Sequence, residues 1–297
     1  MKGGAMWYSG LAERLSQSLN IRQRLISARL SRAANVSRQH AHEFATKYVP
    51  VILSLTSHGD RINTAHIAIE TLLRQTAAAE RLILWISDKY SIAGLPAALR
   101  RQMRRGLDVR FVPDIGPYTK IIYALREFPE HTIVTVDDDS VYAADLIGRL
   151  HDVYTVQPDC VHCHRAHEMM FDENGCLKPY GEWRRQVDDN DAPSHLIFPT
   201  GVGGVLYPPG ALHSEVLNQK VFRAICPTAD DVWLKAMALL NGVKSKRMPG
   251  SHREFPLVSG TKVSGLFYKN IYEKRNDRQI EAVFTHYDLL TRLNGLP

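Results

Sequence analysis

The stretch of this chain that most constrains its fold is Thr132–Ser140, which reads Thr-Ile-Val-Thr-Val-Asp-Asp-Asp-Ser. A run of β-branched residues predicts a buried strand. Three adjacent carboxylates follow it, and they repel one another in a partly dehydrated pocket unless a positive group lies among them. The stretch therefore predicts a central strand that ends at a cation-binding site.

The type of cation follows from the side chains. Alternation along a strand would place Asp137 and Asp139 on one side and Asp138 on the other. In an open α/β sheet, ligands bind outside the carboxyl ends of the strands. Oxygen ligands suit Mg²⁺ or Mn²⁺, which usually bind together with substrate phosphates. We predict that Asp137 and Asp139 are metal ligands; the alternative is an acidic turn that caps the next helix.

The chain around this strand alternates between strand and helix patterns. Because strands and helices alternate, we predict an α/β fold with a doubly wound, mostly parallel sheet flanked by helices and right-handed crossovers. In the first half of the chain, strands are expected at 51–56, 81–87 and 108–112, and helices at 63–75, 96–105 and 117–128. In the second half, a helix is expected at 143–156, a Gly-rich strand at 198–207 and a C-terminal helix at 279–293.

The N-terminus differs from the rest of the chain. Residues 1–47 contain eight Lys or Arg and two Glu, so the net charge of +6 lies there and the remainder is neutral overall. Residues 6–32 carry an apolar stripe at helical spacing among the positive charges. We predict a basic amphipathic helical segment at 1–47, which either contacts an anionic membrane face or packs on the domain or on a second copy of the chain.

The domain that follows is predicted to span 48–297. Its parts are a nucleotide-binding part at 48–140, an acceptor-side part at 141–250 and a C-terminal tail at 251–297. Because the main domain carries no excess positive charge, no nucleic acid is expected as a partner. The sequence has no apolar run that could span a bilayer and no signal-peptide pattern. We expect a cytoplasmic protein, with the inner face of the membrane as the alternative location.

The four cysteines are too few for a disulfide framework and are expected to be reduced thiols. Cys160, Cys163 and His164 form a C-x-x-C-H pattern, which occurs in haem attachment and, with nearby histidines, in zinc sites. The favoured interpretation is a strand at 160–166 with half-buried thiols.

Two loops at the expected carboxyl ends of strands carry groups suited to a nucleoside diphosphate. The first offers Thr56 and Arg61, which can reach a ribose or a phosphate. The second offers Gly116, which allows close backbone approach at a helix start, and Lys120, a point charge. Ordinary turn and cap chemistry is the alternative for each loop. Neither the G-x-G-x-x-G fingerprint nor the P-loop pattern occurs, so a metal is expected to hold the phosphates.

Two later motifs complete the candidate site. Gly203 and Gly204 lie inside the predicted Gly-rich strand, where glycines usually mark close approach of a ligand or a backbone, and we assign them to the donor. Asp230 and Asp231 begin a predicted helix, whose dipole stabilises carboxylates there. We favour Asp231 as a general base toward an acceptor hydroxyl. The alternative is a purely structural helix start capped by Thr228.

Taken together, these motifs resemble those of GT-A-fold glycosyltransferases, including bacterial family-2-like enzymes, with exostosin-like features. The resemblance covers about residues 49–243. It implies a nucleotide-sugar donor, commonly a UDP-sugar, and a glycan or lipid-linked acceptor in polysaccharide biosynthesis. It also implies Mn²⁺ or Mg²⁺ held through Asp139, the last residue of the DXD motif, with Asp137 on the ribose or metal and Asp138 beside the donor.

Some features depart from that family pattern. Many family-2 enzymes have Glu-Asp where this chain has Asp230 and Asp231, and the C-terminal His ligand of some members has only His252 as a candidate here. Two other functions stay open: a nucleotidyltransferase acting on sugar phosphates, and a non-catalytic sugar- or metal-binding module. The sequence leaves the stereochemical outcome and the oligomeric state open as well.

Overall fold

The computed structural model describes residues 21–37, 40–185, 187, 192–250, 255–259 and 275–295. The strands are β1 Lys47–Thr56, β2 Ala77–Ser87, β3 Leu107–Val112, β4 Thr132–Thr135, β5 Val161–Cys163, β6 Ala166–Glu168, β7 Ile197–Pro199, β8 Val205–Tyr207 and β9 Ser245–Arg247. The α-helices are α2 Ala65–Leu73, α3 Ala97–Met103, α4 Thr119–Glu127, α5 Leu146–Val156, α6 Gln219–Ile225, α7 Asp230–Leu240, α9 Arg275–His286 and α10 Leu289–Gly295. The 3₁₀ helices are η1 Ala41–Glu43, η2 Gly59–Asn63, η3 Ile92–Gly94, η4 Gly116–Tyr118, η5 Tyr180–Glu182 and η6 Ser214–Leu217.

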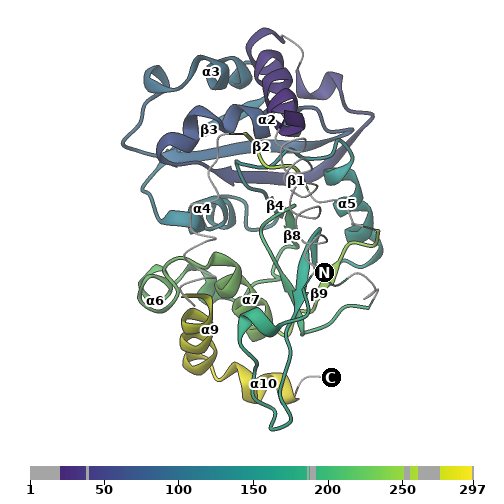
Figure 1. Ribbon diagram of the computed structural model, residues 1–297, viewed down its shortest axis with the longest axis vertical. Coiled ribbons are helices and arrows are strands. Elements are labelled where there is room, and N and C mark those ends of the chain that lie inside the picture. The colour runs from purple at the N-terminus through teal and green to yellow at the C-terminus, as the bar shows by residue number, and fades with distance from the viewer. Residues whose placement is uncertain are drawn as a thin grey trace, which may run out of the picture.

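Seven strands form the central sheet in the order β3-β2-β1-β4-β8-β5-β9 (Figure 1). The pairs β2/β3, β1/β2, β1/β4 and β5/β9 are parallel, whereas β8 runs antiparallel to both of its neighbours. Strands β6 and β7 form a separate antiparallel pair. The predicted mostly parallel α/β sheet is confirmed.

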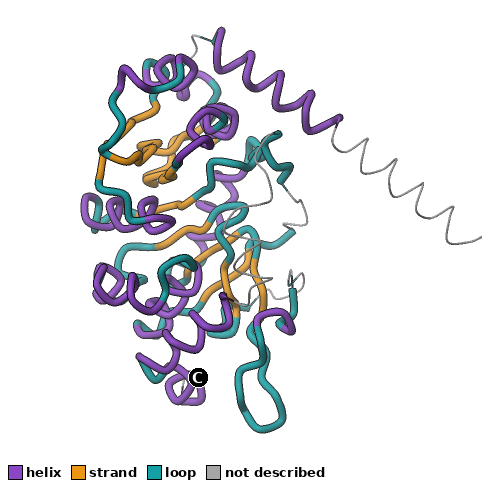
Figure 2. Tube along the Cα trace, turned by 60° about the vertical axis from the view of Figure 1, so that its left-hand side comes forward, coloured by secondary structure: helices purple, strands orange, loops and turns teal. Residues whose placement is uncertain are grey.

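Helices cover both faces of this sheet (Figure 2). Alternate residues of β1 point to opposite faces, so that Leu53 packs with α2, α3 and α5, whereas Ile52 packs with α4 and α7. Strand β1 lies in the middle of the sheet and is buried on both faces, which explains its nearly continuous apolar run. The core that contains Ile52 holds α4 and α7 against the sheet, and the first turns of these two helices bear candidate site residues.

Three predicted elements differ from the structure. The Gly-rich strand expected at 198–207 is two strands, β7 and β8, because Gly203 and Gly204 adopt positive φ angles of 96° and 98° and break the extended chain. The strand expected at 160–166 is likewise divided into β5 and β6. The C-terminal helix is divided into α9 and α10 at Asp288, whose φ is 49°.

The start of α7 is held by a neighbouring helix. In the alternative interpretation Thr228 would cap α7, but the residue at the cap position is Ala229, which has no side-chain cap bond. Instead, Oε1 of Gln279 in α9 accepts from the backbone N–H groups of Thr228 at 2.8 Å and Ala229 at 3.2 Å. Helix α9 buries Ile280, Val283 and Phe284 in the core, so this part of the tail belongs to the domain.

The cysteines are free: Cys160, Cys163 and Cys226 are buried and Cys176 is exposed. Within the residues that the structure describes, no group of three or more His, Cys, Asp or Glu side chains is placed to hold a metal ion. Cys163 lies in β5 and Cys160 directly precedes it, so both thiols are buried at the strand, as expected.

Residues 21–36 form a helix that packs on the domain near α2 (Figure 1). Ser27 and Ala34 are buried, and Oγ of Ser31 lies 2.9 Å from Nε2 of His66. The first part of the predicted N-terminal helix, residues 6–20, lies outside the described residues. No helix in the described part of the chain is long and apolar enough to cross a bilayer.

Candidate active site

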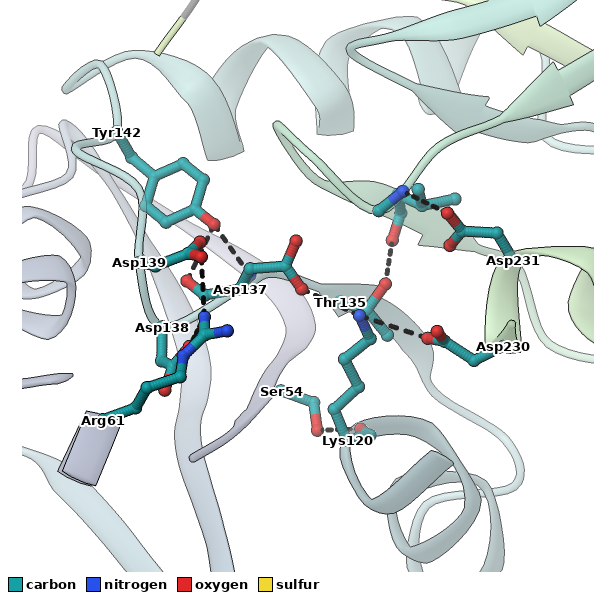
Figure 3. A network of polar contacts seen from close by, with 12 residues as sticks. Ser54, Arg61, Lys120, Thr135, Asp137, Asp138, Asp139, Tyr142, Asp230 and Asp231 are labelled. Carbon is teal, nitrogen blue, oxygen red and sulfur yellow. Dashed lines mark hydrogen bonds and ion pairs between the residues drawn. The ribbon is translucent and has the colours of Figure 1, made fainter. Parts of the chain in front are cut away.

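The candidate site lies at the carboxyl edge of the sheet, where the chain leaves β4 (Figure 3). Strands β1 and β4 are parallel neighbours, so the residues that follow both strands meet at this edge. Helix α4 brings Lys120 to the same place, and α7 brings Asp230 and Asp231 from the other half of the chain.

Lys120 joins the two halves of the site. Its Nζ lies 2.8 Å from Oδ1 of Asp137 and 3.2 Å from Oδ2 of Asp230. Burial disfavours the ammonium charge, but Asp137, Asp230 and Asp231 outweigh burial and raise the pKa of Lys120 well above its usual value. Lys120 therefore stays charged, and it is the cation at which the β4 and α7 carboxylates meet.

The backbone of Lys120 is fixed to the sheet. The hydroxyl of Ser54 in β1 donates to the carbonyl of Lys120. The indole Nε1 of Trp85 in β2 donates to that same hydroxyl at 2.8 Å. Because all three residues are buried, the first turn of α4 is held at a fixed place relative to β4.

Arg61 contacts the other two carboxylates of the triplet. It pairs with Asp138, and its Nη2 lies 2.8 Å from Oδ2 of Asp139. Ser57 donates its hydroxyl to Oδ2 of Asp138 at 2.5 Å. The alternation expected from a strand therefore does not extend through the triplet: Asp138 and Asp139 share Arg61, whereas Asp137 pairs with Lys120. The reason is that β4 ends at Thr135, before the carboxylates begin.

Tyr142 fixes the backbone of Asp137. Its hydroxyl accepts from the Asp137 N–H at 2.7 Å and donates to the Asp137 carbonyl at 2.9 Å. The ring of Phe255 lies 5.4 Å from the ring of Tyr142. The segment 255–259 also pairs with the residues after the triplet, where the Val258 N–H donates to the carbonyl of Asp139 at 2.7 Å. The backbone at both Asp137 and Asp139 is therefore held by later parts of the chain.

Gly201 lies between the charged side chains. Its N–H donates to Oδ2 of Asp231 at 3.1 Å. A Cβ added at Gly201 would lie 3.3 Å from Oδ1 of Asp231, 3.3 Å from Nζ of Lys120 and 3.5 Å from Oδ2 of Asp137. The absence of a side chain here lets these three groups converge, and the backbone N–H orients the Asp231 carboxylate.

The site holds more negative than positive groups. Burial, together with Asp230, raises the pKa of Asp231 to about 7. Burial, together with Asp137, raises the pKa of Asp139 to about 6. Burial opposes the charge of Asp137 as well, but there Lys120 prevails and lowers the pKa. Five carboxylates share the two cations Lys120 and Arg61, and the raised pKa values express this excess.

This donor set fits a hard divalent cation by its chemistry. The side chains that follow β4 offer carboxylate oxygens, which Mg²⁺ and Mn²⁺ prefer. Asp137 and Asp139 are the residues that would hold such an ion. His252, the candidate third ligand, lies outside the described residues.

Four further residues were predicted to bind the donor: Thr56, Gly116, Gly203 and Gly204. The Thr56 hydroxyl donates to the Trp85 carbonyl at 3.0 Å. Gly116 has a positive φ of 70° and open space around its missing side chain. Gly203 packs against the ring of His164, and Gly204 packs against core side chains such as Leu150. The donor-binding roles of these residues stay predictions.

Sequence reasoning missed two residues at the site, Gly201 and Tyr142. Gly201 stands in the same Gly-rich stretch as Gly203 and Gly204, so the composition signal was present but could not distinguish the members of the stretch. Tyr142 follows the triplet by three residues, and nothing in the sequence indicates that its hydroxyl turns back to Asp137.

No protein-family model matches this chain, and no curated protein matches it in sequence. Solved structures with a similar fold include fragment 1–349 of S. aureus TarS in complex with UDP (10% identity, TM-score 0.43), and this chain spans 59% of that fragment with 70% of its own length. Another is the mannosyltransferase PcManGT from Pyrobaculum calidifontis in complex with GDP-Man and Mn²⁺ (12% identity, TM-score 0.47, 95% of this chain and 79% of that one). A third is 4-diphosphocytidyl-2C-methyl-D-erythritol synthase (11% identity, TM-score 0.40, 69% of this chain and 92% of that one). At such low identity, the argument for a function rests on the side chains at the carboxyl edge.

Proposed function

We propose that this protein is a metal-dependent GT-A-type glycosyltransferase that transfers a sugar from a nucleotide-sugar donor, a UDP-sugar in the first instance, to a glycan or lipid-linked acceptor. The observation that carries the proposal is the position of Lys120, between Asp137 on the triplet side and Asp230 at the start of α7. A diphosphate leaving group bound beside the triplet and an acceptor hydroxyl that approaches α7 would both lie next to the Lys120 ammonium group.

The side chains divide into two roles in this proposal. On the donor side, Asp137 and Asp139 would hold the metal, which supplies Lewis-acid stabilisation of the diphosphate when bound. Lys120 adds positive charge where the leaving group develops negative charge. Arg61 pairs with Asp138 and Asp139, and its guanidinium would add positive charge beside the same phosphates.

On the acceptor side, Asp231 acts as the general base. The raised pKa of about 7 suits a group that must take a proton near neutral pH. The Gly201 N–H holds one carboxylate oxygen, which leaves the other to receive the proton of the attacking hydroxyl. The acceptor oxygen forms a bond to the anomeric carbon as the bond to the diphosphate breaks, through an oxocarbenium-like transition state.

The proposal is tested by product analysis. The protein is incubated with Mn²⁺ and a panel of nucleotide sugars that includes UDP- and GDP-sugars, and the released nucleotide is measured. Slow release of nucleoside diphosphate supports a glycosyltransferase. A parallel incubation contains a nucleoside triphosphate and a sugar phosphate. Release of pyrophosphate there would instead indicate a nucleotidyltransferase. Binding without either product would indicate a non-catalytic module.

A further inference from the structure

The helix at 21–36 has two chemically different faces. The face toward the domain carries Ser27 and Ala34, which are buried, and Leu30, which packs on the core formed with α2 and α3. The opposite face carries Ile21, Leu25 and Val36, whose exposed fractions are 57%, 56% and 67%. Residues 21, 25, 32 and 36 lie on one line of an α-helix, so these three apolar side chains form an outward stripe.

Positive charge surrounds this stripe. Arg22 and Arg29 lie beside it, Arg24 lies along its other edge and Arg32 lies within it, and all four are exposed. Residues 21–37 include no Asp or Glu. In Figure 2, the helix at 21–36 extends away from the sheet, so that its first described turn stands clear of the domain.

We propose that this outward face, made of Ile21, Leu25 and Val36 with the four arginines, binds the surface of an anionic lipid bilayer. Arginine guanidinium groups pair with lipid phosphates, while the apolar stripe enters the boundary between headgroups and acyl chains. The helix lies in the plane of the surface. This inference rests on the helix alone and does not depend on the proposed transfer reaction.

The charges and apolar side chains of this face fit an anionic bilayer better than a second copy of the chain or a nucleic acid. A second copy of the same face would bring arginines against arginines, because residues 21–37 carry no negative side chain to pair with them. A nucleic acid would satisfy the arginines but would leave Ile21, Leu25 and Val36 in water. A surface with phosphates above an apolar layer satisfies both kinds of side chain.

The same helix is connected to the candidate site. Oγ of Ser27 accepts from the Ser259 N–H at 3.0 Å. The neighbouring Val258 N–H donates to the carbonyl of Asp139 at 2.7 Å. The membrane-facing helix therefore lies one short segment away from the triplet, which would bring the carboxyl edge close to the bilayer.

Vesicle binding tests the proposal. The full-length protein is mixed with vesicles of phosphatidylcholine containing phosphatidylglycerol, and with vesicles of phosphatidylcholine alone, and the bound fraction is measured by co-sedimentation at low and high salt. We expect binding to the anionic vesicles that weakens with salt. Since each arginine at such a surface contributes about fivefold to binding, Arg22→Gln/Arg29→Gln should lower partitioning about 25-fold. Leu25→Asn should lower it about tenfold or more, through loss of apolar burial.

Matched controls carry the same changes elsewhere. Lys220→Gln/Arg223→Gln removes two exposed positive charges from α6, and Val156→Asn removes an apolar side chain that is 84% exposed on α5. Both control variants should bind as the wild type does. Equal losses in the controls and the helix variants, or equal binding to neutral vesicles, would overturn the proposal. A dimer in light scattering that Leu25→Asn dissociates, with no vesicle binding, would assign the face to a second copy instead.

Discussion

The backbone N–H of Gly201 donates to Oδ2 of Asp231 at 3.1 Å, and the space beside it is filled by Lys120 and Asp137. This relationship orients the carboxylate that we assign as the base. It also means that a methyl group at residue 201 would contact Lys120 Nζ and Asp231 Oδ1 at 3.3 Å, closer than ordinary van der Waals contact. The site should therefore be sensitive to the smallest possible substitution here.

We expect Gly201→Ala to reduce the transfer rate by about 10- to 100-fold, because it displaces Lys120 and Asp231 by a few tenths of an ångström. The control is Gly181→Ala, since a Cβ at Gly181 meets nothing within 4 Å. Steady-state kinetics and a thermal unfolding curve separate loss of activity from loss of fold. A Gly201→Ala protein with wild-type activity would show that the close approach of these groups is not required.

We expect Asp231→Asn to lower the transfer rate by about 10²- to 10⁴-fold, the usual contribution of a general base. Binding of the donor should remain, since Asp231 lies on the α7 side of Lys120. Asp152→Asn, which changes an exposed carboxylate paired with Lys47 on the surface, is the control. Single-turnover kinetics measure the chemical step, and calorimetry measures donor affinity. Retention of more than about a tenth of the wild-type rate would remove Asp231 from the role of base.

The same substitution should affect stability in a pH-dependent way. The pKa of Asp231 is about 7 in the folded protein, above its ordinary value of 3.8, so the folded state holds the proton more tightly than the unfolded state. The wild type therefore loses stability as pH rises from about 4 to about 7, and Asp231→Asn does not incur this loss. Each unit of pKa difference corresponds to about 1.4 kcal/mol, so we expect the variant to be more stable by at least about 1 kcal/mol at pH 8.

The measurement is urea unfolding of both proteins at pH 4 and pH 8. The gain in the free energy of unfolding should be present at pH 8 and small at pH 4, where Asp231 is protonated in the folded wild type. A gain of equal size at both pH values would mean that the substitution acts through packing and not through the buried charge.

The parts of the fold that were predictable are those with strong local patterns. β1 and β2 contain apolar runs of β-branched and aliphatic residues buried in a parallel sheet, and the alternation of such runs with helices indicated that the sheet is mostly parallel. The convergence of Asp137 and Lys120 was expected because both follow strands that end at one edge. Asp230 and Asp231 were recognisable as a pair at a helix start.

The parts that were not predictable depend on contacts between distant residues. Nothing local indicates that Lys120 pairs with Asp230, which lies far along the chain in another element. The division of the Gly-rich stretch arises because β8 returns antiparallel beside β4, while β7 pairs with β6. Alternation is lost in the triplet because β4 ends at Thr135, and the contact of Arg61 with both Asp138 and Asp139 depends on a residue far away in the sequence.

In the proposed function, the carboxylates after β4 hold a divalent cation together with a nucleotide diphosphate. Titration calorimetry of UDP into the wild type and into Asp139→Asn, each with Mn²⁺ and with a chelator, tests this role. We predict UDP binding by the wild type that requires Mn²⁺, and loss of that binding in Asp139→Asn. Unchanged Mn²⁺-dependent affinity in Asp139→Asn would contradict the claim.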